Sequence, residues 1–408
     1  MIHVDPFDLL LDKIHDYRIN HNESPIWISG WNVEDEKISP PLFLKDRFKK
    51  LPLELVQYAF INEAYKAKES TANSLRHIIT IQGNPVQASN IAIVPSGTQG
   101  LLLILTTFRD LLEIRRLIVV APGYFAFTSI AEHLKIESSI IPSDDFFKAS
   151  IPFEQLKTEA NQSKQGIVLT NPAYGVGIER HNKEYQTLFQ LLSSQTPILL
   201  DETSLGLSWD NRGPWDMIDI PENVVILRSP SKLFLMHGRK FSFIVASPSI
   251  VRYIESIAEY LIGSVSGNIQ EDAMTYMTAI TEWQNEIDSL KDGMWMRWKQ
   301  TIVNRIQYNL STVRDILEVA GFQLSLINSA YYVLVGKPKD QFKEVDSIDI
   351  LKLCGVVYTW SDGFCHISPS LRAFRTNLAG NPLHVSYALK KSLPIILKEY
   401  PYQVKSHF

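Results

Sequence analysis

The sequence NVVILRSPSKLFLMHGRKFSFIVA occupies residues 223–246 and holds two apolar runs around a polar loop. The runs NVVIL (223–227) and FSFIVA (241–246) are rich in β-branched and aromatic residues, which is typical of buried β-strands. Five more apolar runs precede them: IAIVP (91–95), LIVVA (117–121), SSIIP (138–142), GIVLT (166–170) and PILLD (197–201). Amphipathic helical stretches lie between most of these runs. Apolar strands separated by helices predict an α/β fold with a mostly parallel, seven-stranded sheet covered on both faces.

A second and smaller α/β pattern follows a helix-rich region that ends near residue 320. Its segments are the strand AYYVLV (330–335), the helix SIDILKLC (347–354), the strands GVVYTW (355–360) and FRTNLA (374–379), and a helix over 382–400. Residues before about 45 show little periodicity beyond an opening helix. We therefore predict an N-terminal arm (1–45) that contributes to the small domain, a large domain (46–300) and a C-terminal small domain (301–408).

The composition excludes several classes of protein. Hydrophobic residues make up 45% of the 408 residues, as in a globular protein, and the net charge of −4 gives no argument for binding nucleic acid. Two cysteines, Cys354 and Cys365, are too few for a disulfide framework or a zinc site. No apolar stretch approaches the length that crosses a bilayer, and the N-terminus does not resemble a signal peptide. We expect a soluble, cytoplasmic protein without bound metal and without a nucleic-acid or membrane partner.

Short polar motifs follow five of the predicted strands. In open α/β sheets a ligand binds at the carboxyl ends of the strands, so these motifs are candidates for a site. Each also has a structural explanation, such as a simple turn, a core aromatic ring, a helix cap or a surface lysine. The motifs are Ser96-Gly97-Thr98-Gln99-Gly100, Pro122-Gly123-Tyr124-Phe125, Asn171-Pro172 with Gly177, Asp201-Glu202, and Ser229-Pro230-Ser231-Lys232.

In this order and spacing, the motifs resemble those of the class I and II aminotransferases. These are fold-type I enzymes that depend on pyridoxal 5′-phosphate (PLP). The small domain adds FRTNLA (374–379), which is similar to the family segment that holds the substrate-carboxylate arginine. The resemblance runs from about residue 60 to the C-terminus. It implies a PLP-dependent transferase-like large domain and a smaller α/β domain.

The resemblance also implies a role for each catalytic residue. Lys232 would hold PLP as a Schiff base and shuttle a proton once the substrate displaces it. Asp201 would pair with the pyridine nitrogen, so that the ring can accept electrons. Asn171 would hydrogen-bond the 3-oxygen of the ring, and Tyr124 would stack on the ring.

Two further groups of residues would bind the phosphate and the substrate. Arg375 would grip the substrate carboxylate as a bidentate fork, and Gly30 aligns with a substrate loop of the family. Trp31, Tyr174 and Trp360 are candidates to line the pocket for the substrate side chain. The residues implied around the phosphate are Gly97, Thr98, Ser229 and Ser231.

Two positions depart from the family pattern. A phosphate-binding arginine usually stands eight residues after the lysine, where this chain has Lys240. Arg239 is one residue earlier, but the spacing favours Lys240 as the phosphate contact, because no insertion is needed. Ser204 stands where the family has a tyrosine near the 3-oxygen, and its side chain is too short for the same contact. It remains a cofactor-binding candidate by position.

These departures leave two reactions open. The first is an aminotransferase acting on an α-amino acid and a 2-oxo acid. The alternative is a PLP-dependent lyase, cyclase or oxidase of the same fold that acts without net transamination. In either case the resemblance implies a homodimer, with Ser264-Val265-Ser266-Gly267 similar to a cross-subunit phosphate contact. Tyr65 is a further candidate for such a contact, but its spacing is one residue off, which favours a core or surface tyrosine instead.

Overall fold

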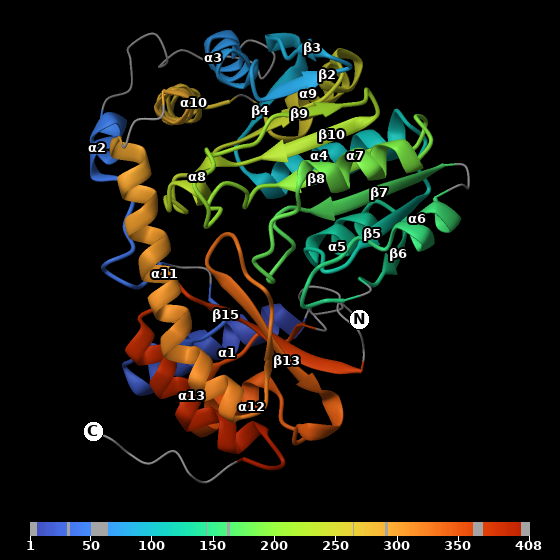
Figure 1. The fold of residues 1–408 in the computed structure, drawn as a ribbon. Helices are drawn as coiled ribbons and strands as arrows, with labels where there is room; N and C mark the ends of the chain where they lie inside the picture. The colour runs from blue at the N-terminus through green and yellow to red at the C-terminus, as the bar shows by residue number, and fades with distance from the viewer. Residues whose placement is uncertain are drawn as a thin grey trace.

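A computed structural model describes most of the 408 residues: 6–30, 33–49, 64–143, 145–160, 164–263, 265–289, 293–361 and 370–400. Figure 1 shows a larger part built around one sheet and a smaller part below it. The long helix α11 (Met294–Val319) runs from the larger part to the smaller one.

The larger part contains a seven-stranded sheet in the order β4-β11-β10-β8-β7-β5-β6. Strand β11 is antiparallel to both neighbours, and the other pairs are parallel. The predicted α/β fold with a mostly parallel seven-stranded sheet is confirmed, and every strand end lies within one residue of its predicted run. The strands are β4 (Ile91–Val94), β5 (Arg116–Val120), β6 (Glu137–Ile141), β7 (Gln165–Thr170), β8 (Ile198–Glu202), β10 (Val224–Arg228) and β11 (Ser242–Val245).

The central strands are apolar because the sheet is covered on both faces. All residues of β4, β7, β8, β10 and β11 are buried, as expected for strands between two layers of helices. The helices of this part are α3 (Tyr65–Leu75), α4 (Gly97–Asp110), α5 (Ala126–His133), α6 (Phe153–Glu159), α7 (Asn182–Leu191), α8 (Pro230–Leu233), α9 (Pro248–Leu261) and α10 (Gly267–Asp288). A small sheet of β2 (Ile79–Ile81), β3 (Asn84–Pro85) and β9 (Ile218–Ile220) was not anticipated from the sequence.

The smaller part combines the C-terminal segments with the N-terminal helix. Strand β1 (Ile26–Trp27) pairs in parallel with β14 (Val356–Val357), and α1 (Pro6–His21) lies beside α12 (Ser347–Cys354). The remaining elements of this part are β12 (Gln323–Leu324), β13 (Tyr332–Pro338), β15 (Leu371–Asn377) and α13 (Pro382–Ile396), whereas α2 (Leu42–Lys45) lies beside the start of α11, level with the larger part. The N-terminal segment thus packs on the C-terminal one, while the domain limits themselves stay a prediction.

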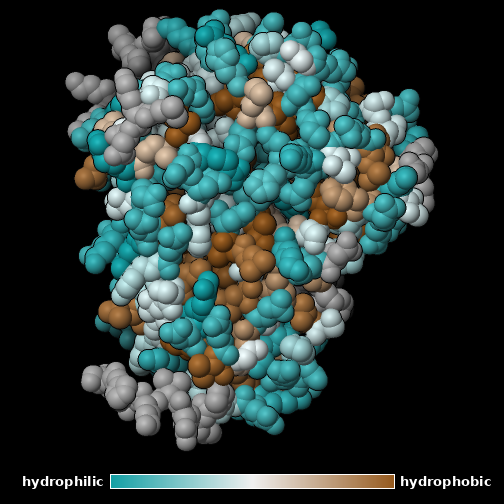
Figure 2. Space-filling model, viewed as in Figure 1, coloured by the Kyte–Doolittle hydropathy of each residue, from teal (hydrophilic) through white to brown (hydrophobic). Residues whose placement is uncertain are grey.

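The surface where the two parts meet differs from the rest of this face. Figure 2 shows hydrophobic residues gathered near the middle of the view, whereas the upper part is largely hydrophilic. No helix among the described residues is long and apolar enough to cross a membrane.

Candidate active site

One pocket lies at the carboxyl ends of the parallel strands. It has a volume of about 390 Å³, within the usual range for small-molecule sites. Ten of the twelve predicted site residues line it. They are Gly97, Thr98, Tyr124, Asn171, Asp201, Ser204, Ser229, Ser231, Lys232 and Lys240.

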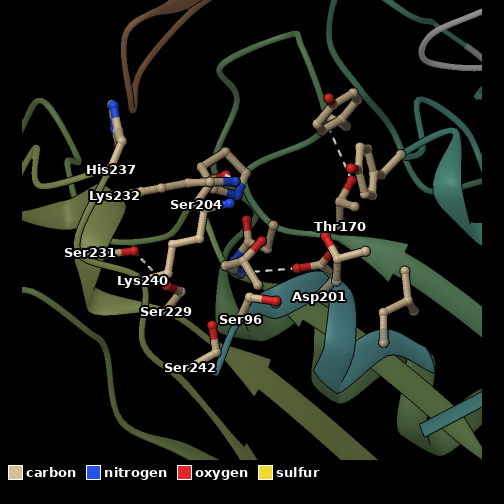
Figure 3. Close-up of a pocket in the computed structure, with 18 of the residues that line it drawn as sticks. Ser96, Thr170, Asp201, Ser204, Ser229, Ser231, Lys232, His237, Lys240 and Ser242 are labelled. Carbon is tan, nitrogen blue, oxygen red and sulfur yellow. Dashed lines mark hydrogen bonds between the residues drawn. The ribbon is translucent and has the colours of Figure 1, made fainter. Parts of the chain in front are cut away.

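Lys232 presents its amine in the middle of this pocket. It lies on the short helix α8, directly after β10, and its Nζ donates a hydrogen bond to Ser204 Oγ at 3.1 Å. Figure 3 shows the lysine side chain pointing toward Ser204. Burial lowers the pKa of the Lys232 amine, and the negative charge of Asp201 opposes this shift. A lowered pKa leaves more of the amine neutral, which is the form that attacks a carbonyl.

Asp201 is the acidic residue whose charge acts on the pKa of this amine. It lies near the end of β8 with 6% of its surface exposed, and its Oδ1 accepts a hydrogen bond from Thr203 N at 3.0 Å. Burial raises the pKa of the Asp201 carboxyl, whereas the hydrogen bond from Thr203 and the charge of Lys232 lower it. A buried carboxylate of this kind is stabilised by a cationic partner.

Asn171 is fixed beside Asp201 by the backbone. Asn171 N donates to Asp201 O at 2.8 Å, and Asn171 Oδ1 accepts from Arg180 N at 2.8 Å. The second contact orients the amide, since its oxygen is engaged and its N–H donors remain for other acceptors.

One side of the pocket is rich in hydroxyl groups and backbone N–H donors. Ser96 caps α4, with its Oγ accepting from Gln99 N at 3.3 Å. A Cβ on Gly97 would lie 2.9 Å from Thr203 Cγ2, so this helix start approaches the neighbouring loop too closely for a side chain. The N-terminus of a helix with free N–H groups is suited to an anion.

The serines after β10 complete this side. Ser229 Oγ donates to Phe241 O at 2.6 Å and lies 2.8 Å from Ser231 Oγ. Ser242 Oγ lines the same pocket, is buried, and has no hydrogen-bond partner within the described part of the chain. Figure 3 shows these three serines on the same side of the pocket as Lys240.

The neighbouring cations Arg239 and Lys240 face different surroundings. Arg239 Nε donates to Asp272 Oδ1 at 2.7 Å, and its guanidinium lies 4.1 Å from the ring centroid of Phe48. Lys240 lines the pocket and acts on the pKa of Lys232 through its charge. This geometry favours Lys240 over Arg239, and the role of Lys240 stays a prediction.

Tyr124 lies at the other side of the pocket, after β5. Burial raises the pKa of its hydroxyl, and a hydrogen bond with Thr98 opposes the shift. Its ring centroid is 4.9 Å from that of Tyr174, which also lines the pocket.

A second, smaller cavity of about 30 Å³ connects Lys232 to Arg375. Arg375 lies on β15 and is almost fully buried, with its Nε donating to Ser29 O at 3.1 Å. Gly30 follows that serine but lines neither cavity. The structure thus places Arg375 in the same cavity as Lys232 and leaves Gly30 outside both cavities, and their substrate roles stay predictions.

Several residues of the site were missed by sequence reasoning. His237, Tyr331 and Tyr332 line the larger cavity, as does Ser242. The pattern AYYVLV identified a strand but gave no signal that its first residues reach the site. Of the predicted substrate-pocket residues, Tyr174 lines both cavities.

Trp360 lines neither of these two cavities. Trp360 stacks on Tyr358 with ring centroids 5.2 Å apart, and Arg372 lies over its ring. Trp31 and Ser264 lie outside the described residues. Ser266 Oγ caps α10, and Tyr65 is 64% exposed at the start of α3. Their cross-subunit roles stay predictions.

Within the described ranges, no group of three or more His, Cys, Asp or Glu residues is placed to hold a metal ion.

The family model described as aminotransferase class I and II matches residues 58–390, which is most of the chain. The chain belongs to this family. The resemblance drawn from the strand-end motifs is therefore confirmed. This family relationship supports an enzyme of the aminotransferase type.

Curated relatives of this chain are distant in sequence. The chain is 21% identical over 226 residues to a histidinol-phosphate aminotransferase of Haemophilus influenzae, covering 54% of this chain and 62% of that relative. It is 22% identical over 299 residues to an aspartate aminotransferase of Pyrococcus horikoshii, covering 70% and 72%. The match therefore spans less than two thirds of the first relative.

Solved structures share the fold over nearly the whole chain. A double mutant of Thermus thermophilus aspartate aminotransferase has a TM-score of 0.77 at 13% identity, and covers 97% of both chains. An aminotransferase from Mycobacterium tuberculosis has a TM-score of 0.74 at 18% identity, with the same coverage. These similarities show the fold of this aminotransferase and leave its substrates to be argued from the site.

Proposed function

We propose that this protein is a PLP-dependent aminotransferase that moves an amino group between an α-amino acid and a 2-oxo acid. The observation that supports this proposal most directly is that Lys232, Asp201 and Asn171 line one cavity. Lys232 and Arg375 together line the cavity next to it. In this proposal Lys232 holds the cofactor.

The residues present fit PLP at both of its ends. Ser242 Oγ is a buried hydroxyl without a partner among the described residues, and it lies with Ser229, Ser231 and Lys240 where an anion could be bound. A phosphate offers acceptor oxygens to these donors, and the start of α4 adds backbone N–H groups. At the other end, Asp201 is a buried carboxylate suited to a protonated ring nitrogen.

When bound, PLP supplies an electron sink that makes the bond at the substrate Cα labile. The protein then has to hold the substrate and move a proton. Arg375 would bind the α-carboxylate as a planar fork and so fix the position of Cα. The Lys232 amine, with its lowered pKa, is suited to accept the proton from Cα and to return it as a general acid and base. Asn171 would orient the ring through its N–H donors.

Ser204 keeps the alternative reaction under consideration. Its hydroxyl accepts a hydrogen bond from Lys232, and its side chain is shorter than that of the tyrosine in the family pattern. A lyase, cyclase or oxidase would use the same Lys232, Asp201 and Arg375 without forming the amino form of the cofactor.

The deciding experiment adds amino acids one at a time to the purified holo-protein. An aminotransferase converts bound PLP into pyridoxamine 5′-phosphate and releases the matching 2-oxo acid, both measurable by absorbance and mass spectrometry. Release of ammonia or carbon dioxide without pyridoxamine 5′-phosphate would instead favour the alternative. An unchanged cofactor and unchanged amino acid in every mixture would contradict both.

We also propose that the protein works as a homodimer. The motivation is the family relationship, together with the hydrophobic surface gathered where the two parts meet in Figure 2. Sedimentation of the holo-protein at micromolar concentration is expected to give a dimer. A monomer that keeps full activity on dilution would contradict this proposal.

A further inference from the structure

The space between Lys232 and Arg375 defines where a substrate side chain must lie. The two cavities share Pro172, Tyr174, Ser204, Lys232 and Tyr332, so they lie next to each other. If the substrate amine is at Lys232 and its carboxylate is at Arg375, Cα lies between them. The side chain then has to contact residues beside that line.

The residues left for this contact form an aromatic wall, which we define as Tyr174, Tyr331, Tyr332 and His237. All four line the larger cavity, and Tyr174 and Tyr332 also line the smaller one. The rings of Tyr331 and Tyr332 have centroids 4.5 Å apart. Tyr331 OH lies 2.6 Å from His237 Nε2, which joins the start of the β13 segment to the loop after Lys232.

The wall also surrounds the arginine. The guanidinium carbon of Arg375 is 4.3 Å from the ring centroid of Tyr332 and 5.7 Å from that of Tyr174. Tyr332 lies opposite Asn377 in the strand pair, two residues along from the position of Arg375. Diagonal neighbours on one face of a sheet contact each other, so this ring is held beside the substrate carboxylate site.

The proposed function already assigns a role to each lysine and arginine that lines the two cavities. Among the described residues that line the two cavities, the lysines and arginine are Lys232, Lys240 and Arg375. Two of them serve the cofactor and the third serves the α-carboxylate. His237 adds no cation near neutral pH, because burial and the charge of Lys232 lower its pKa to about 4.

We propose that the aminotransferase substrate carries an uncharged aromatic side chain, which packs against the aromatic wall. This inference rests on the proposed function and adds the class of substrate to it. Aromatic rings gain from packing on other rings beyond the area that they bury. A second carboxylate would lose its water against the same wall without a cation to pair with it.

The first test measures binding of unreactive acids to the unaltered holo-protein. 3-Phenylpropionate and succinate both offer a carboxylate to Arg375, but only succinate brings a second charge. We expect 3-phenylpropionate to bind at least about tenfold more tightly, by spectral titration or calorimetry. Equal or tighter binding of succinate would overturn the inference, since a cation outside the described residues would then serve the site.

The second test compares amino acids in the half-reaction that forms pyridoxamine 5′-phosphate. L-Phenylalanine and L-tyrosine are expected to react at least about tenfold faster than L-aspartate, L-glutamate and L-leucine, at equal subsaturating concentration. Faster reaction of aspartate, or equal reaction of leucine, would overturn the aromatic preference. If no amino acid forms pyridoxamine 5′-phosphate, the proposed function fails, while the binding comparison still decides the side-chain class.

A substitution in the wall provides a gain-of-function test. His237→Arg adds a cation to the wall and should move the ratio of succinate to 3-phenylpropionate affinity toward succinate by about tenfold. His133→Arg, on the exposed end of α5, is the matched control and should leave the ratio unchanged. An unchanged ratio in a folded His237→Arg protein would show that the wall does not contact the substrate side chain.

Discussion

The two halves of the proposed site, one assigned to the cofactor and one to the substrate, are built in different ways. The cofactor half comes from loops at the carboxyl ends of strands in one sheet, including Asp201 at the end of β8 and Lys232 after β10. The substrate half adds Arg375 and Tyr332 from two strands of the smaller part, which reach the site only when that part packs against the sheet. The first half follows from topology, whereas the second follows from how two separate units dock.

This difference predicts separable consequences for substitutions. A change in the cofactor half should alter retention of PLP, and a change in the substrate half should alter substrate binding in a protein that still retains PLP. Lys232 belongs to both halves, because it would hold the cofactor and face the substrate.

Lys232→Ala should have the largest effect. It removes the amine that would bond the cofactor and move the proton at Cα, so the rate of amino transfer should fall by about 10²–10⁴-fold or more. PLP should still bind through the remaining contacts, but borohydride treatment should leave no cofactor attached to the chain. Mass spectrometry of the reduced protein measures this. A reducible bond that persists in the alanine variant would show that another lysine holds PLP.

Arg375→Lys should weaken binding of the amino acid substrate without weakening binding of PLP. A lysine keeps the charge but loses the bidentate fork, so the KM for the amino acid should rise by about 10–100-fold, corresponding to roughly 1.5–3 kcal/mol. The affinity for PLP should stay near that of the unaltered protein. The control is Arg372→Lys, in the same strand, whose guanidinium packs on Trp360 and donates to Val345 O at 2.6 Å. Equal changes of KM in both variants would contradict the assignment of Arg375.

The same contrast explains what could be predicted from sequence. The apolar runs placed all seven strands, and because parallel strands share one carboxyl edge, the residues that follow them could be expected to meet. That reasoning correctly grouped Asn171, Asp201 and Lys232 in one pocket. Their chemical roles came from the family resemblance and stay predictions.

Residues outside this topological rule could not be found in the same way. Ser242 is the first residue of β11, which runs antiparallel to its neighbours. The start of β11 therefore lies at the edge of the sheet where the parallel strands end, and no sequence pattern indicated that β11 runs in this direction. Tyr331 and His237 meet across the two parts of the chain, 94 residues apart. Such a contact depends on docking geometry, which local periodicity does not encode.

Lys240→Ala tests which cation contacts the phosphate in the cofactor half. Its charge lies in the pocket beside the serine hydroxyls, so its removal should weaken PLP binding by about 1–3 kcal/mol, measured as the dissociation constant of the apo-protein for PLP. Arg239→Ala is the matched control from the adjacent position. Arg239 pairs with Asp272, so its loss should lower the stability of the fold and leave PLP affinity largely unchanged. Loss of PLP only in Arg239→Ala would mean that the phosphate contact is one residue earlier.

The contact of His237 with Tyr331 joins the two halves and predicts a pH dependence of stability, while activity near neutral pH should not change. Burial and the charge of Lys232 lower the pKa of His237 from 6.5 to about 4 in the folded protein. Between these values the unfolded chain binds a proton at this histidine that the folded chain does not, so the free energy of unfolding should fall as the pH drops from about 6.5 to about 4. The slope from one such group is at most about 1.4 kcal/mol per pH unit.

His237→Asn keeps a neutral polar side chain beside Tyr331 and should reduce this slope in urea unfolding of the apo-protein, whereas His133→Asn on the exposed end of α5 should preserve it. A slope that is the same in all three proteins would mean that His237 is not held neutral where the two halves meet.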